Sequence, residues 1–184
     1  MKATQQLKEE HSAVLLMLQV LEKLVDRLIE GDRSSAEDLP AIIDFLKGFV
    51  DRCHHGKEEE WLFPALEAAG IPRQNGPIGV MLQEHEAGRS LIQDMVETLD
   101  VLEAGESQVA LKEAAHNYIQ LLRTHITKEN EVLFKMADIK LTAAQQDELY
   151  ENFERLELER MGAGQHEEYH KLLHQLMEKY GLNG

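Results

Sequence analysis

The feature that most constrains this chain is a ten-residue stretch that begins at His54 and recurs at His125. Aligned without gaps, the two copies place a histidine and a glutamate four residues apart, as His54 with Glu58 and as His125 with Glu129. On an α-helix this spacing stacks two side chains on one face. An imidazole and a carboxylate that converge from one face, supplied twice, are suited to holding a pair of iron ions.

Two further histidines fit the same repeat. His85 lies 74 residues after His11, and His125 lies 71 residues after His54, so the chain has the pattern of a duplicated helical hairpin. At a rise of about 1.5 Å per residue, His11 lies about 30 Å before the first loop and His54 about 25 Å after it. In the second hairpin, His85 and His125 each lie about 29 Å from the loop by the same rise. We therefore expect four histidines on four helices at nearly one depth.

Burial explains why such a layer should hold metal. An unpaired carboxylate in a bundle core costs several kcal/mol, and an unpaired imidazole is also unfavourable. A metal ion removes both penalties because it binds neutral imidazole and carboxylate directly. Glutamates on opposed helices can each bridge two ions and leave the histidines as terminal ligands. Imidazole with carboxylate favours iron, with manganese and zinc as alternatives.

Helical periodicity of the apolar positions predicts an all-α fold. Four long helices joined by short loops form an antiparallel up-down four-helix bundle, and two extra helices follow at the C-terminus. After a polar loop, a capping pair of Ser35 and Asp38 is expected to open the second helix, which Pro64 is expected to kink. Thr142 with Gln145 forms a second capping box. The expected helices span residues 3–30, 38–69, 78–104, 107–137, 142–161 and 165–180.

Length and composition limit the number of domains and the kinds of partner that this chain can have. At 184 residues the chain suits one domain, with 1–137 as the metal-binding bundle and 138–184 as a helical extension packed on it. The formal net charge of −15 repels phosphate backbones and anionic lipid, so we expect neither nucleic acid nor membrane as a partner. No apolar run approaches the roughly 20 residues that span a bilayer. A single cysteine, Cys53, and no secretory signal indicate a cytoplasmic protein without disulfides.

The order of these residues resembles that of a known family. One histidine, then His-x-x-x-Glu, then one histidine, then His-x-x-x-Glu, on a four-helix bundle, is similar to the hemerythrin-like HHE cation-binding family over about the first 137 residues. The resemblance implies a non-haem di-iron centre that binds dioxygen or nitric oxide, or that senses or stores iron. It also implies two bridging glutamates and four terminal histidines, which here are Glu58, Glu129, His11, His54, His85 and His125.

The chain departs from the oxygen-carrying members of that family at one position. Those proteins have a second histidine one turn before the first on the third helix, where this chain has Met81, and Arg89 follows one turn after His85. A fifth histidine is missing unless His55, Glu59 or a C-terminal residue replaces it. The departure argues against reversible oxygen carriage and leaves the prediction of two metal ions intact.

Several neighbouring residues allow both a structural and a functional interpretation. His55 lies about 100° around the helix from His54, which indicates a histidine that points away from the site. Cys53 is expected to be a small buried residue, since thiolates favour softer metals. Arg89 is expected to be exposed or paired. Tyr118 is expected to belong to the core, where it could also donate a hydrogen bond to a metal ligand.

The last helix carries histidines at intervals of four, His166, His170 and His174, which a solvated edge explains better than a metal site. A ferritin-like site needs Glu-x-x-His on two helices, and one copy of that pattern ends at His116. His116 lies nine residues before His125, which is about 180° away around the helix. It cannot face the same core, so the ferritin interpretation is rejected.

These residues predict a non-haem di-iron, or di-metal, binding protein. It would bind dioxygen, nitric oxide or a related small ligand at an open iron position, for sensing, protection or iron storage, and it is not expected to be an enzyme. A di-iron redox enzyme that turns over peroxide or repairs nitrosative damage is the alternative. A partner-binding bundle with a purely structural metal is a third hypothesis. The C-terminal helices could form a homodimer interface or cover the bundle.

Overall fold

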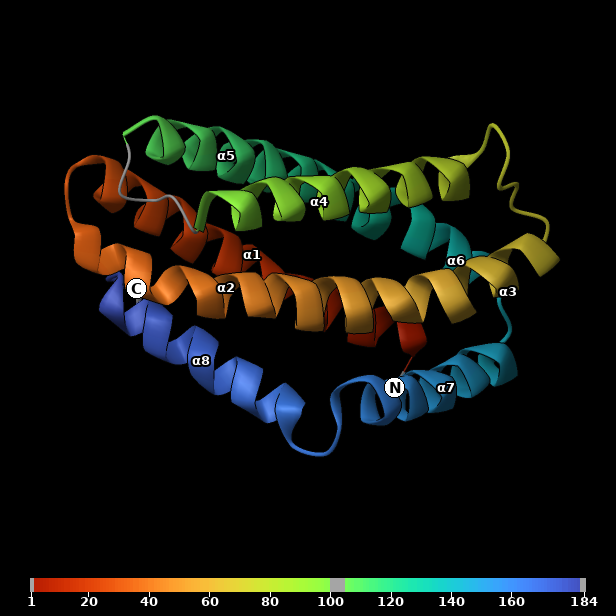
Figure 1. Cartoon of the computed structure of the whole chain (residues 1–184). Coiled ribbons are helices and arrows are strands. Elements are labelled where there is room, and N and C mark those ends of the chain that lie inside the picture. The colour runs from red at the N-terminus through yellow and green to blue at the C-terminus, as the bar shows by residue number, and fades with distance from the viewer. Residues whose placement is uncertain (1, 100–104, 183–184) are drawn as a thin grey trace.

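The computed structural model describes residues 2–99 and 105–182, almost all of them in helices (Figure 1). No strand occurs in these two ranges, so the predicted all-α fold is confirmed. The helices from 3 to 140 form rods that lie side by side, and the helices at 143–161 and 165–179 lie along one side of them (Figure 1). The predicted end of the third helix at Ala104 lies outside the described residues.

In chain order the elements are α1 (Ala3–Ile29), η1 (Arg33–Asp38), α2 (Leu39–Phe45), η2 (Leu46–His55), η3 (Glu58–Leu62), α3 (Phe63–Ala68), α4 (Pro77–Leu99), α5 (Gly105–Lys128), η4 (Glu129–Leu133), α6 (Phe134–Lys140), α7 (Ala143–Met161) and α8 (Gln165–Lys179). Helix α1 is the first rod of the bundle and α4 is the third. The second rod consists of α2, η2, η3 and α3, which follow one another without a break, and the fourth consists of α5, η4 and α6.

The segments η2, η3 and η4 are π-helical, so their backbone hydrogen bonds join residues five apart. Glu58 opens η3 and Glu129 opens η4, and in both the amide of a phenylalanine five residues later donates to the glutamate carbonyl. Pro64 lies two residues after the end of η3, in the first turn of α3. The two glutamates of the repeat thus share a backbone distortion of a kind that often marks functional sites.

The connection between α1 and α2 differs from the prediction. The 3-10 helix η1 replaces the expected polar loop. The predicted pairing of Ser35 with Asp38 is wrong, because Asp32 precedes η1 and accepts hydrogen bonds from the two serines that follow it. Asp38 instead accepts a hydrogen bond of 2.8 Å from Tyr180, which follows α8. The predicted capping box at the start of α7 is confirmed.

The core of the described chain falls into two apolar clusters. One lies toward the connection of α1 with α2 and includes Leu21 and Phe49, and the other lies toward the connection of α3 with α4 and includes Leu7 and Phe63. In each rod a buried histidine lies between the residues of the two clusters. The histidines therefore form one layer across the bundle, at the common depth that their spacing predicts.

Helices α7 and α8 cover one side of the bundle, where both contact α1 and the second rod, α8 through Tyr169 (Figure 1). Phe153 of α7 belongs to one apolar cluster, and Tyr169 of α8 belongs to the other. Across the described ranges, no helix combines the length and the apolar character that a membrane crossing requires.

Candidate metal centre

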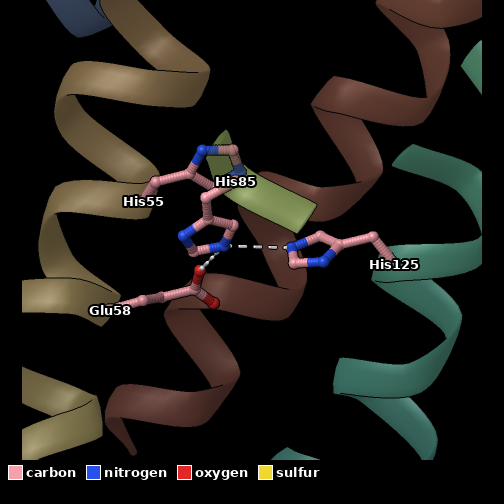
Figure 2. A group of neighbouring side chains, drawn as sticks. All are labelled: His55, Glu58, His85 and His125. Carbon is pink, nitrogen blue, oxygen red and sulfur yellow. Dashed lines mark hydrogen bonds and ion pairs between the residues drawn. The ribbon is translucent and has the colours of Figure 1, made fainter. Parts of the chain in front are cut away.

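Between the apolar clusters, the described residues form two groups of buried histidine and glutamate side chains. The first group consists of His55, Glu58, His85 and His125, whose ligand atoms lie within 4.8 Å of one another. Figure 2 shows these side chains converging from the second, third and fourth rods. The Nε2 atoms of His85 and His125 are 3.2 Å apart, and Glu58 Oε2 lies 3.3 Å from His85 Nε2.

The second group consists of His11, His54, Glu58 and Glu129, again with ligand atoms within 4.8 Å of one another. The Nε2 atoms of His11 and His54 are 3.0 Å apart. Glu58 belongs to both groups, since its second oxygen lies 3.7 Å from His54 Nε2. Glu129 Oε2 lies 3.1 Å from His11 Nε2 and 3.3 Å from His125 Nε2. Each glutamate therefore faces a histidine of both groups, as a bridging carboxylate would.

The glutamate oxygens test whether these residues fit a metal ion. Glu58 and Glu129 are fully buried, and none of their four carboxylate oxygens has a hydrogen-bond partner among the described residues. A buried carboxylate without partners costs several kcal/mol. Since divalent cations would satisfy all four oxygens and also bind the imidazoles, the donor set fits a metal centre.

The two glutamates differ in pKa. Burial, together with the neighbouring charge of Glu129, raises the pKa of Glu58 well above its usual range. Burial would also raise the pKa of Glu129, but His125 and His11 outweigh it and lower this pKa to about 2. Of the two carboxylates, Glu58 therefore binds a proton more readily, and a cation would compete with that proton.

Most of the histidines for which a shift is resolved favour the neutral form. Burial, helped by the neighbouring histidines, lowers the pKa of His55 well below its usual range. Burial also lowers the pKa of His54 to about 4, although a hydrogen-bonded carboxylate opposes the change. A neutral imidazole keeps one nitrogen lone pair for a metal. His11 differs, because Glu129 outweighs burial and raises the pKa of His11.

An oxygen atom contacts the second ring nitrogen of each of the four histidines in the repeat. The distances from Nδ1 to oxygen are 2.9 Å for His11 with Asn130, 2.7 Å for His54 with Glu10, 2.7 Å for His85 with Glu59, and 3.0 Å for His125 with Glu84. A carboxylate or amide oxygen can only accept, so Nδ1 must donate its hydrogen. Each neutral ring therefore turns the lone pair of Nε2 into the centre.

The sequence analysis did not predict the roles of Glu10 and Glu84, although the repeat contains a signal for both. Glu10 and Glu84 each stand directly before a histidine of the layer. Each also accepts a hydrogen bond from a lysine, Lys57 or Lys128, that lies three residues after the histidine it orients. The recurrence of Glu-His and of His-x-x-Lys in both halves could have identified these pairs.

The prediction that His55 points away from the site is wrong. His55 is 4% exposed, and its ring stacks on that of His85 with centroids 3.8 Å apart (Figure 2). Neither ring nitrogen has a hydrogen-bond partner within the described chain. The physical reason is that the second rod packs against both α1 and α4, so that two positions about 100° apart both face the inside. His54 contacts His11 of α1, and His55 stacks on His85 of α4. His55 therefore joins His54 on the inner side of the rod.

Other residues near the centre have structural roles. Cys53 is buried, as predicted, and burial raises the pKa of its thiol to about 12. Met81 belongs to an apolar cluster. Arg89 was expected to be exposed or paired, and it forms ion pairs with three carboxylates. Tyr118 is a core residue whose hydroxyl has no partner in the described ranges.

The remaining candidate histidines lie apart from the layer. Among the described residues, neither group includes His116 or the three histidines of α8. His174 is exposed, as a solvated edge predicts, whereas His166 and His170 are only partly exposed. The His166 side chain is 27% exposed and lies 3.0 Å from Glu157 of α7.

Comparison with known proteins agrees with this geometry. Residues 2–137 match the family model of the hemerythrin HHE cation binding domain. An uncharacterised protein of Mycobacterium tuberculosis is 28% identical over 163 residues, which cover 87% of this chain and 63% of that protein. The iron-sulfur cluster repair protein YtfE of Yersinia pestis is 30% identical over 134 residues, which cover 71% of this chain and 58% of that protein. The chain thus aligns with less than two thirds of the length of these curated relatives.

Proposed function

Since the chain belongs to the hemerythrin HHE cation-binding domain family, we propose that its buried histidine and glutamate groups hold two iron ions. We further propose that this centre binds dioxygen, nitric oxide or a related small ligand, for sensing, protection or iron storage. A bound iron pair supplies redox activity and coordination positions for such a ligand. The protein supplies the donor atoms, their orientation and a surrounding from which water is largely excluded.

The observation that carries this proposal is the set of four partnerless oxygens on Glu58 and Glu129. Each carboxylate faces histidines of both groups, so each would bridge the two ions. Imidazole and carboxylate donors favour iron, manganese or zinc over softer metals. The terminal ligands would be His11 and His54 on one ion, and His55, His85 and His125 on the other.

The two ions would have unequal ligand sets. His55 would supply the third imidazole of the first group, in place of the helix-three histidine for which this chain has Met81. The ion held by His11 and His54 would have fewer protein donors and keep more positions for an outside ligand. We therefore place the small ligand on the side of His11 and His54.

The first test is the iron content per chain of anaerobically purified protein, followed by its absorption spectrum on adding air and then azide. We expect two irons per chain and new near-ultraviolet and visible charge-transfer bands. One ion or none would contradict the paired site. Two ions without a response to azide would contradict an open position and favour a structural metal.

A matched pair of double variants tests the ligands. Glu58→Gln with Glu129→Gln removes both bridging carboxylates at nearly constant volume, and we expect it to lose both irons. Glu60 and Glu131 occupy equivalent positions of the repeat two residues later, where both are exposed. Their double change to glutamine should keep both irons. Retention of two irons by the first variant would refute the assignment.

A second candidate function is the repair of iron-sulfur clusters after nitrosative damage, which the 30% identity with the Yersinia pestis protein favours. The test is the recovery of an iron-sulfur enzyme, inactivated by nitric oxide, on addition of the iron-loaded protein. The variant without bridging glutamates is the control. Turnover of hydrogen peroxide, lost in His85→Ala, would instead favour the redox enzyme.

A further inference from the structure

A chain of contacts leads outward from His54 and does not end at Glu10. Glu10 Oε2 accepts the hydrogen of His54 Nδ1 at 2.7 Å, and Glu10 Oε1 accepts from Lys57 Nζ at 2.6 Å. The ammonium of Lys57 donates on to Glu157 Oε2 of α7 at 2.7 Å. Since Lys57 is fully buried, its charge depends on these two carboxylates.

The second half of the repeat provides an internal comparison. There Glu84 accepts from His125 and from Lys128, just as Glu10 accepts from His54 and Lys57. The side chain of Lys128 is 41% exposed, however, and water can share its charge. The buried ammonium of Lys57 instead donates a hydrogen bond to the carboxylate of Glu157, which takes the role that water has for Lys128. Glu157 lies outside residues 2–137, so the first half relies on a residue that the shared domain does not contain.

The contacts continue from α7 to α8. Glu157 Oε1 lies 3.0 Å from His166 Nδ1, and His166 Nε2 lies 2.9 Å from His170 Nε2. Glu10, Glu157 and both histidines line a surface cavity of about 310 Å³. The histidines of α8 thus form the outer end of a connection that begins at a proposed metal ligand.

We propose that Glu157 and His166 are positioning residues for His54, acting through Lys57 and Glu10, and that binding of metal and docking of α8 favour each other. The carboxylate of Glu157 neutralises part of the ammonium charge of Lys57. Glu10 therefore keeps its Oε2 atom for the hydrogen bond from His54 Nδ1. His166 fixes Glu157 from the other side. Any such coupling is reciprocal, so an ion that fixes His54 also stabilises the contact with α8. The coupling to metal rests on the proposed function, whereas the positioning of His54 does not.

The test uses the full chain with Glu157→Gln, which keeps the shape of the side chain and removes its charge. Glu154→Gln is the matched control, since Glu154 lies one turn earlier on α7, lines the same cavity and accepts a hydrogen bond from Gln6 rather than from Lys57. Nitrogen-15 spectra of the histidine rings in the metal-free protein report the Nδ1 hydrogen of His54. His125 serves as an internal control, because its Nδ1 partner is Glu84 of α4, which Lys128 of α5 contacts, and these contacts involve neither α7 nor α8.

We expect Glu157→Gln to shift the His54 signal and leave that of His125 unchanged, and we expect Glu154→Gln to change neither. His166→Gln, at a partly exposed position, should shift His54 in the same direction by a smaller amount. An unchanged His54 signal, or equal shifts of both histidines, would overturn the positioning role.

The second readout is the affinity for ferrous iron, measured by anaerobic competition with a chelator. We expect Glu157→Gln to lower the affinity for one of the two ions by about tenfold. This is the lower end of the effect that is typical for hydrogen-bond partners of metal ligands. Iron should also slow hydrogen exchange of the amides at 169–173 in wild type and in Glu154→Gln, but not in Glu157→Gln. Unchanged affinity and exchange would overturn the coupling. A wild-type protein that binds no iron pair would refute the proposed function instead, and the spectra would still decide the positioning.

Discussion

At the scale of single residues, His55 makes the two halves of the centre unequal. The repeat places Ile126 at the equivalent position of the second half, so the first half alone brings a third imidazole to the layer. In the described chain both ring nitrogens of His55 are buried without a hydrogen-bond partner, although Nδ1 lies 3.5 Å from Asp51, and this destabilises the metal-free protein. The same residue should therefore oppose folding and favour metal binding.

The change His55→Ile, which copies the second half, separates these effects. We expect it to weaken the binding of one iron by about tenfold or more, and to keep or raise the free energy of unfolding of the metal-free protein by about 1 kcal/mol. Chelator competition and denaturant unfolding measure the two quantities. Ile126→Val is the control and should keep the iron affinity. An unaltered affinity in His55→Ile would exclude His55 as a ligand.

We expect the pair of His166 and Glu157 to make the docking of α8 depend on pH. The carboxylate of Glu157, 3.0 Å from Nδ1, raises the pKa of His166, with Glu10 adding to the shift and burial and Lys57 opposing it. The stabilisation is therefore complete below the ordinary histidine pKa of about 6.5, and it is lost as pH rises through the raised pKa of His166. We expect up to about 1 kcal/mol, because the pair is partly exposed. The measurement is the thermal stability of the wild type and of His166→Gln between about pH 5.5 and 8.5. We expect the difference between the two proteins to shrink as the pH rises, and a difference that stays constant would contradict the prediction.

The proposed ligands show how far single residues can be predicted from sequence. His54 with Glu58 and His125 with Glu129 are identifiable because a spacing of four has one meaning on a helix, and the repeat adds His11 and His85. His55 was assigned to the wrong side because that rule assumes a single inward direction, whereas the second rod faces both α1 and α4. Glu157 is not predictable in this way, since its contact with Lys57 depends on how a separate helix docks.

At the scale of elements, the second rod must bring His54 and His55 to the centre and also accept α8 on its flank. Gly48 in η2 makes this close approach possible, because a Cβ atom there would lie 2.1 Å from the hydroxyl oxygen of Tyr169 and 2.9 Å from its ring. Gly56 lies on the same rod, but a Cβ there would meet Leu156 at 3.7 Å, an ordinary contact.

These two glycines give a matched prediction. We expect Gly48→Ala to lower the free energy of unfolding by about 1 to 3 kcal/mol through overpacking, and to speed hydrogen exchange in α8. Gly56→Ala should be neutral or stabilising by up to about 1 kcal/mol, since alanine is the better helix former. In the double variant Gly48→Ala with Tyr169→Leu, part of the free energy of unfolding that Gly48→Ala loses should be restored. Equal effects of the two alanines would show that helix propensity, not the contact with Tyr169, decides.

The elements themselves were predictable where apolar periodicity and caps agree, as at α7, whose Thr142 and Gln145 form the expected box. The π-helical segments were not, because apolar spacing reports which face is buried and not which carbonyl each amide meets. The start of η1 was also missed, since Asp32 and Asp38 both have capping chemistry and only the folded chain shows which one the serines reach.

At the scale of the whole molecule, the bundle consists of two apolar clusters separated by a polar layer. The clusters gain stability from burial, whereas the layer concentrates the carboxylates of Glu58 and Glu129, which lack hydrogen-bond partners in the described structure. We therefore expect the layer to destabilise the metal-free bundle, and the net charge of −15 favours the approach of a cation to it.

Metal removal should therefore lower stability through the layer. A ligand that binds only the folded state, at about 100 times its dissociation constant, stabilises by about 2.7 kcal/mol, which corresponds to a rise in Tm of roughly 5–10 °C for a chain of this length. We expect that difference between iron-loaded and chelator-treated wild type in anaerobic thermal unfolding. The double change of Glu58 and Glu129 to glutamine should abolish the difference, while that of Glu60 and Glu131 should preserve it. A Tm that iron leaves unchanged in the wild type would mean that the polar layer is stable by itself, and that metal is not what balances its buried charge.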